Sequence, residues 1–146
     1  MGTRSSIKFY SNDTDHPLVN IFQMFDGYID GVGYDLAQWL CSKIMINGIG
    51  ERTSQEYCNG AGCLVAQFIK DKKVGVGGLY IDTMNRTCDY NYKVIINDCI
   101  PFDVDEVPVN NLTKIIVTNF NETEPIFKGT PEELLKFNEH GEEYIL

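Results

Sequence analysis

The sequence predicts a single α+β domain over residues 1–146, with an antiparallel sheet of five to six strands, two central helices and a C-terminal helix. Three observations support this class. Strand-like apolar segments lie on both sides of two segments with helical periodicity. Short turns join consecutive strands, which favours antiparallel pairing. The chain is long enough to bury a core without metal or disulfide staples, and it contains no repeat or linker.

Strands are expected where apolar residues alternate or where β-branched residues gather. The clearest are residues 90–96, in which Tyr90, Tyr92, Val94 and Ile96 share one face, and residues 112–120, which are rich in Ile, Val and Thr. Shorter strands are predicted at residues 7–10, 18–25, 79–81 and 124–128.

Three helices are predicted. The first covers about residues 34–45, because Leu36, Trp39, Leu40 and Ile44 recur at helical spacing. The second covers residues 60–72. The third begins at the capping box Thr130-Pro131-Glu132-Glu133 and runs to about residue 139.

Glycine-rich segments precede both central helices. Gly27, Gly31 and Gly33 lie before the first, and the run Asn59-Gly60-Ala61-Gly62 begins the second. Glycine permits a close approach by a ligand, and the unpaired N–H groups of a helix start attract anions, phosphates above all. The alternative, equally open from sequence, is that these glycines only allow tight turns or close helix packing.

The charge balance restricts the partners. With 12 basic and 21 acidic residues, the formal charge of −9 argues against a surface that binds duplex nucleic acid, although backbone N–H groups and one or two arginines could still hold a small anion. The longest apolar run is far shorter than the ~20 residues of a transmembrane helix. The N-terminus lacks the apolar region of a secretory signal. We therefore expect no membrane partner and a cytoplasmic location.

The sequence shows no convincing catalytic or metal site. Five cysteines lie at 41, 58, 63, 88 and 99 without zinc-site spacing, and we expect them to be reduced. Cys63 near a helix start could serve as a nucleophile, but its only downstream base, His140, lies after the last helix. No catalytic residue, metal or cofactor is therefore expected.

The candidate site is instead a binding site. Arg52 and Arg86 flank the glycine-rich segments and are bidentate phosphate donors, while Tyr28 or Tyr80 could stack on a base. The full candidate set is Asp26, Gly27, Tyr28, Gly31, Gly33, Arg52, Asn59, Gly60, Gly62, Tyr80, Arg86 and Asn91.

Several short patterns resemble a family of small phage and prophage proteins. They are F-D-G-Y-x-x-G-x-G-x-x-L-A-x-x-L at 25–40, N-G at 47–48, N-G-x-G-C-L-x-A-Q at 59–67, V-G-G-x-Y at 76–80 and D-Y-x-Y at 89–92. The resemblance covers roughly residues 18–96. Many such proteins have Pro where this chain has Ile29, and residues from Pro101 onward match nothing in the family.

Among phage proteins of this size, the chain is similar in character to the Thoeris anti-defence sponges. That similarity implies an oligomeric binder that sequesters a cyclic ADP-ribose type of signal in the host cytoplasm without cleaving it, and it assigns no residue. We also expect a homo-oligomer, a dimer or higher, because aromatic residues are frequent and sheet edges need cover. Two alternatives remain: an acidic inhibitor or nucleic-acid mimic that binds a host defence protein, and a nucleotide-cleaving enzyme.

Overall fold

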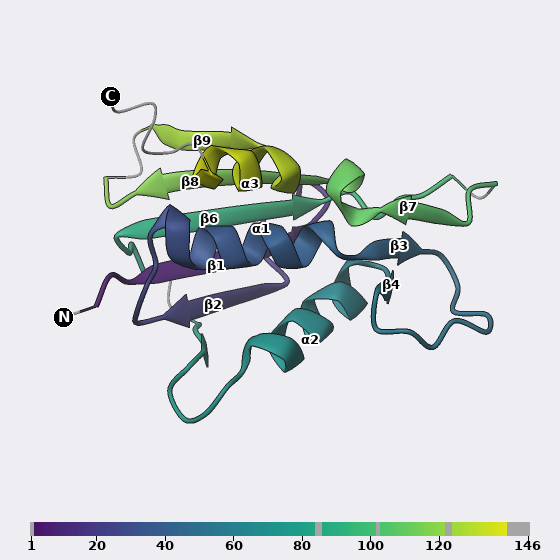
Figure 1. Cartoon of the computed structure of the whole chain (residues 1–146), viewed down its shortest axis with the longest axis horizontal. Coiled ribbons are helices and arrows are strands. Elements are labelled where there is room, and N and C mark those ends of the chain that lie inside the picture. The colour runs from purple at the N-terminus through teal and green to yellow at the C-terminus, as the bar shows by residue number, and fades with distance from the viewer. Residues whose placement is uncertain (1, 84–85, 102, 122–123, 140–146) are drawn as a thin grey trace.

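The computed structural model describes residues 2–83, 86–101, 103–121 and 124–139. These residues form three α-helices and two sheets, so the predicted α+β class is confirmed (Figure 1). The larger sheet has six strands in the order β5-β2-β1-β6-β8-β9. The strand bounds are β1 Ser5–Ser11, β2 Val19–Gln23, β5 Tyr80–Ile81, β6 Tyr90–Ile96, β8 Thr113–Asn119 and β9 Pro125–Gly129.

The sheet differs from the antiparallel expectation at one strand pair. β1 and β6 run parallel, whereas the pairs β1–β2, β2–β5, β6–β8 and β8–β9 are antiparallel. A short turn dictates antiparallel pairing only between strands that it joins directly. β1 and β6 are separated by both central helices in sequence, so the long connection permits a parallel neighbour.

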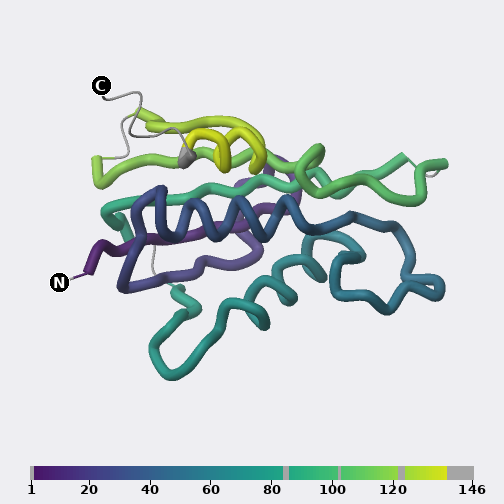
Figure 2. The backbone as a smooth tube through the Cα atoms, in the orientation of Figure 1, coloured from purple at the N-terminus to yellow at the C-terminus, as the bar shows by residue number. Residues whose placement is uncertain are grey.

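A second, three-stranded sheet lies beyond the end of α1 and was not predicted. Its order is β4-β3-β7, with β3 at Ile44–Ile46, β4 at Tyr57–Asn59 and β7 at Glu106–Pro108. In Figure 2 the chain passes from the first helix directly into the segment that forms this sheet.

The predicted helix over residues 34–45 is therefore too long. The helix α1 is Tyr34–Cys41, and Ser42 closes it by donating a hydrogen bond from Oγ to the carbonyl of Trp39 at 2.6 Å. Ile44 belongs to β3 and pairs with Tyr57 and Pro108. Tertiary pairing of this β-branched segment has overridden its helical spacing.

The three helices cover one face of the larger sheet, in front of it in Figure 1. Besides α1 they are α2 at Ala61–Lys72 and α3 at Pro131–Glu139. The ring of Phe68 on α2 lies 5.1 Å from Phe9 on β1 and 5.1 Å from Trp39 on α1. On α3, Phe137 packs at 5.5 Å against Phe127 of β9. The core thus fills the layer between the helices and the sheet.

The capping box of α3 is confirmed. The backbone N–H of Glu133 donates to Thr130 Oγ1 at 3.2 Å, and the N–H of Thr130 donates to Glu133 Oε1 at 2.9 Å. This reciprocal pair satisfies two N–H groups that a helix start otherwise leaves open. Among the helices described, none is long and apolar enough to cross a membrane.

Candidate functional site

The first glycine-rich segment is packed against its own chain. A Cβ at Gly27 would lie 2.8 Å from the Arg4 carbonyl, one at Gly33 would lie 3.0 Å from Tyr92 Oη, and one at Gly31 would overlap the Asp26 carbonyl. Asp26 itself adopts a positive φ of 58°. These glycines are required by a tight turn, the alternative that the sequence left open.

The N–H groups of Gly31, Val32 and Gly33 are also occupied. A five-residue turn, Ile29–Gly33, leads into α1, and within it Val32 N–H donates to the Asp26 carbonyl at 2.8 Å. Gly31 and Gly33 donate to the Tyr28 carbonyl at 2.9 and 3.4 Å. The expected phosphate cradle is therefore not present here, because the donors bond within the turn.

The start of α2 is occupied by a carboxylate of the protein itself, that of Asp98. Asp98 Oδ2 accepts the N–H of Ala61 at 3.0 Å, and Ser11 and Asn12 also donate to this carboxylate. Gly60, with φ of 90°, places that N–H, while the Asn59 side chain accepts from Gly48 N–H instead of capping the helix. Asp98 therefore supplies the anion that this helix start was predicted to attract.

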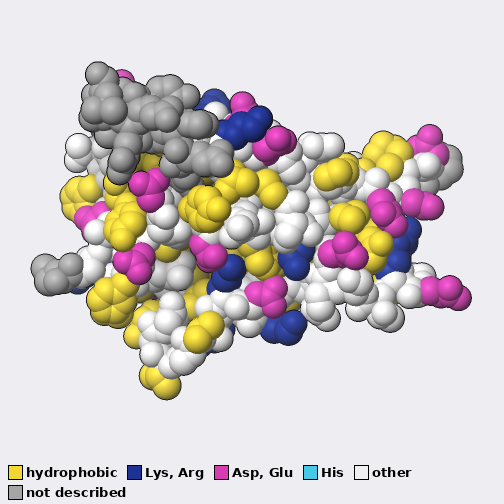
Figure 3. Space-filling view, viewed as in Figure 1, with side chains coloured by type: hydrophobic (Ala, Val, Ile, Leu, Met, Phe, Trp, Pro, Cys, Tyr) yellow, Lys and Arg dark blue, Asp and Glu magenta, His cyan; other side chains and the backbone are white. Residues whose placement is uncertain are grey.

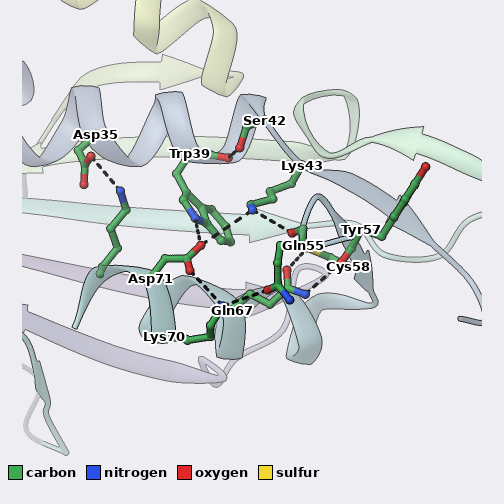
Figure 4. Close-up of polar contacts among 11 residues, drawn as sticks. Asp35, Trp39, Ser42, Lys43, Gln55, Tyr57, Cys58, Gln67, Lys70 and Asp71 are labelled. Carbon is green, nitrogen blue, oxygen red and sulfur yellow. Dashed lines mark hydrogen bonds and ion pairs between the residues drawn. The ribbon is translucent and has the colours of Figure 1, made fainter. Parts of the chain in front are cut away.

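The two helix starts also lie far from one another. Lys72, the last residue of α2, contacts Asp35 at the start of α1 with Nζ–Oδ1 of 2.9 Å, so the two helices run in opposite directions (Figures 1 and 4). One small ligand cannot touch both starts, contrary to expectation.

The two predicted arginines are separated as well. Arg52 pairs with Glu106 at 3.2 Å beside the small sheet, and Arg86 pairs with Asp82 at 2.6 Å near β5. Arg86 also lies 5.0 Å from the ring of Phe22.

The polar cluster between α1 and α2 is structural (Figure 4). The indole N–H of Trp39 donates to Asp71 at 2.8 Å, and the buried Lys43 lies 3.9 Å from Asp71 and donates to the Gln55 carbonyl at 3.0 Å. The Trp39 hydrogen bond is the largest cause that lowers the pKa of Asp71. Burial raises the pKa of Cys58 to about 12, so its thiol stays protonated and bonds Gln67.

The catalytic pair considered from the sequence is Cys63 with His140, and His140 lies outside the described residues. Within the described parts of the chain, no group of three or more His, Cys, Asp or Glu side chains is placed to hold a metal ion.

The face of the larger sheet opposite the helices has a different composition. Phe9, Tyr92 and Phe127 point toward the helix side, so the residues that alternate with them point away. The strand positions that point away from the helices include four lysines and no acidic residue. These positions are Ser6, Lys8, Tyr10, Asn20, Phe22, Tyr80, Asn91, Lys93, Ile95, Lys114, Ile116, Thr118, Pro125 and Lys128. The helix side, in contrast, shows acidic and basic side chains interspersed (Figure 3).

Three of these lysines lie on one line across the strands. Lys8 on β1 is the register partner of Lys93 on β6, Lys93 pairs with Ile116 on β8, and Ile116 pairs with Lys128 on β9. We call Lys8, Lys93 and Lys128 the lysine row. Like charges directly opposite one another destabilise a sheet. The row therefore places positive charges close together on one face of the sheet.

Two hollows meet at the lysine row. One of about 280 Å³ lies over β1, β6 and β8, and one of about 520 Å³ lies over β1, β2 and the segment after β5. Both are lined by Lys8 and Tyr10. The first also contains Asn91, Lys93, Ile116 and Thr118, and the second also contains Asp15, His16, Asn20 and Asp82. The uncovered face is thus hollowed on both sides of Tyr10.

Aromatic side chains lie beside these cations. Lys93 Nζ lies 4.9 Å from the centroid of the Tyr10 ring, and Tyr80 lies 6.1 Å from the ring of Phe22. Burial raises the pKa of Tyr10, so its phenol remains neutral at physiological pH. A neutral ring next to two lysines can accept a base without repelling its phosphate.

The uncovered face includes three of the predicted residues. Asn91 lines the 280 Å³ hollow, but its amide is held by Ser6, Cys88 and Asn119, so it serves mainly to fix the strands. Tyr80 and Arg86 lie around Phe22 at the β5 edge.

The sequence reasoning missed Lys8, Tyr10 and Lys93. The signal that could have found them is the alternation that identified the core: the face of residues 90–96 opposite Tyr92 carries Lys93, and Lys8 and Tyr10 alternate with Phe9.

Comparisons with protein-family models, with curated proteins and with solved structures gave no match for this chain.

Proposed function

We propose that the protein binds a phosphate-bearing nucleotide on the uncovered face of its larger sheet and sequesters it without cleaving it. The observation that carries the proposal is the direct pairing of Lys8 with Lys93 in a chain whose formal charge is −9. In this acidic chain two lysines lie side by side on one face, and a phosphate near Lys93 would be attracted by both positive charges.

The neighbouring groups supply the rest of a nucleotide site. Tyr10 gives an aromatic surface for the base, and Ser6 and Thr118 add hydroxyl groups to the floor of the same hollow. Lys93 forms no ion pair with any residue of the described chain, so its charge is available to a phosphate. Lysine binds phosphate as a compact point charge, which suits an open sheet surface.

The biological role is proposed from the resemblance to phage proteins. A cyclic nucleotide signal of the cyclic ADP-ribose type, held in the host cytoplasm and kept from its effector, is the first ligand to test. The absence of an assigned base–nucleophile pair fits binding without turnover.

A second candidate, protein binding, is favoured by a different surface. Exposed apolar side chains surround a hollow of about 440 Å³ at the junction of β2 and the turn before α1. They are Met24, which is 36% exposed, and Phe25, which is 61% exposed. Apolar side chains gathered at one place on a surface often mark an interface. The simplest occupant is a second copy of the chain, which would form the expected homo-oligomer; a host defence protein is the alternative.

Calorimetry tests the nucleotide proposal. The panel comprises 5′-AMP, cyclic mononucleotides, cyclic dinucleotides and cyclic ADP-ribose isomers, and the ligand is recovered afterwards for chromatography. We expect one class to bind and to be recovered intact, and Lys93→Gln to weaken its binding at least tenfold. The matched control is Lys136→Gln, on the helix side, which should bind normally. Absence of binding across the panel would refute the proposal, and a cleaved product would make the protein an enzyme.

A further inference from the structure

We infer that the ligand of the uncovered face is a short single-stranded oligonucleotide, two or three nucleotides long, which lies along β6. The inference rests on the proposed function and specifies the class of its nucleotide. It follows from three hollows that succeed one another along β6 and β8, two strands that lie side by side in the larger sheet (Figure 1).

The three hollows follow the register of these two strands. The first, of about 190 Å³, lies where β6 begins and β8 ends, and Asp89 and Phe120 line it. The second is the 280 Å³ hollow at Lys93, in the middle of β6. The third, of about 270 Å³, contains the register partners Ile95 and Lys114 at the opposite end. The seven residues of β6 span about 20 Å, so a mononucleotide cannot reach from the first hollow to the third.

Each hollow contains a cation that forms no ion pair with any described residue. These cations are Arg4 in the first, Lys93 in the second and Lys114 in the third. The second and third hollows contain no acidic residue, and in the first the carboxylate of Asp89 accepts the backbone N–H of Arg4 at 3.0 Å. Lys93 and Lys114 are diagonal neighbours on adjacent strands, about 7–8 Å apart at the backbone. Successive phosphates of one strand therefore meet successive cations.

Aromatic and apolar side chains accompany these cations. Phe120 in the first hollow is 63% exposed, and Tyr10 in the second lies against Lys93. Half-buried Ile95 and Leu112 line the third hollow. Proteins that bind single strands combine cations along the sugar–phosphate backbone with aromatic rings on which bases stack. The first two hollows each offer this combination, and the third offers a cation beside an apolar surface.

The charge of the protein limits the length of the ligand. Three cations serve two or three phosphates, and a longer strand would extend past the hollows over a chain whose formal charge is −9. A duplex is excluded for the same reason. Linear and cyclic oligonucleotides share the required chemistry, since both present several phosphates and unpaired bases.

The experiment measures affinity against ligand length. Wild type is titrated with 5′-AMP, with linear 5′-phosphorylated oligoadenylates of two, three and four nucleotides, and with cyclic di-AMP and cyclic tri-AMP. We expect the linear or the cyclic trinucleotide to bind at least tenfold more tightly than 5′-AMP, and the fourth nucleotide to add less than twofold. The tighter of the two trinucleotides shows whether the groove accepts a linear or a cyclic strand.

Variants at the two ends of β6 locate the ligand. Lys93→Gln should weaken every ligand that binds by at least tenfold. Lys114→Gln and Phe120→Ser should each weaken the trinucleotide by at least fivefold and 5′-AMP by less than twofold. Lys136→Gln on α3 and Val74→Ser, at an apolar residue that is 75% exposed after α2, are the matched controls and should bind like wild type. Equal melting temperatures exclude loss of folding as the cause.

The outcomes separate the inference from the proposed function. If Lys93→Gln weakens binding but 5′-AMP binds as tightly as every longer ligand, the inference is overturned and the proposed function stands. The same holds if neither Lys114→Gln nor Phe120→Ser affects the trinucleotides, or if affinity continues to rise with each added nucleotide. If no ligand binds, or if Lys93→Gln has no effect, the proposed function fails and the inference fails with it.

Discussion

Lys8 on β1 and Lys93 on β6 are direct partners in a parallel strand pair, on the face of the sheet that the helices leave uncovered. Their neighbour Tyr10 has its ring 4.9 Å from the Lys93 ammonium. Under the proposed function, a phosphate bound beside Lys93 would be attracted by both lysines. The paired strand positions of this face thus carry lysines and no acidic residue, although the whole chain is acidic.

The pairing of Lys8 with Lys93 leads to a prediction about stability. Millimolar pyrophosphate should raise the melting temperature of the wild-type protein, because a ligand that binds only the folded state stabilises it by mass action. The same addition should have a much smaller effect on Lys93→Gln, while Lys136→Gln should respond like wild type. An equal rise in all three proteins would show that the anion acts elsewhere.

The capping box at the start of α3 gives a second prediction. Replacing Thr130 with Ala removes the acceptor of the Glu133 N–H and should lower the free energy of unfolding by about 1 kcal/mol. Thr53→Ala, in an exposed loop, serves as the control and should change it by less than about 0.5 kcal/mol. Urea denaturation measures both, and equal midpoints for the two variants would contradict the assignment.

The contact between Trp39 and Asp71 predicts a pH dependence. The pKa of Asp71 is lowered in the folded state, so the ionised carboxylate stabilises the protein above its unfolded pKa of about 3.9 and loses that effect as the pH falls through the folded pKa. Asp71→Asn should therefore be less stable than wild type at pH 7, and the difference should shrink below about pH 4. Trp39 is the single tryptophan, so its fluorescence follows unfolding directly. If the difference in stability between wild type and Asp71→Asn did not change with pH, the contact would not depend on the ionised carboxylate of Asp71.

The exposed apolar cluster predicts self-association. Light scattering at micromolar concentration should give at least twice the chain mass of 16.6 kDa, and Phe25→Ser should shift it toward the monomer. Ile49→Ser is a matched control, because Ile49 is 57% exposed but lies in the loop between β3 and β4. A monomeric wild-type protein would contradict the dimer hypothesis, and a partner protein would then be the remaining candidate to bind the cluster.

All five cysteines are free in the structure, and we predict that they are reduced in solution. Thiol titration of the unfolded protein without reductant should find five reactive groups.

Much of the fold could be predicted from local patterns. Residues 90–96 are a strand as expected, the second and third helices begin within a residue of their predicted starts, and the capping box has its expected bonds. The errors come from long-range pairing. Nothing within residues 34–46 shows that Ile44 will find β4 and β7, and nothing near β1 shows that β6 will lie parallel to it.

The candidate site was harder to predict for a related reason. The glycines form a tight turn and precede a helix start, as expected. Their N–H donors, however, bond to Asp98 and to carbonyl groups of the same turn, and only the tertiary structure reveals this. The lysine row is likewise formed from strands far apart in sequence, so no short motif contains it.

The most direct test of the central claim is lysine footprinting. The protein is acetylated with and without the tightest ligand of the nucleotide panel, and the modified lysines are identified by mass spectrometry. We predict protection of Lys8 and Lys93 and unchanged labelling of Lys70 and Lys136, which lie on helices α2 and α3. Protection at Lys70, or equal labelling of Lys8 and Lys93 in both samples, would contradict a nucleotide site on the uncovered face.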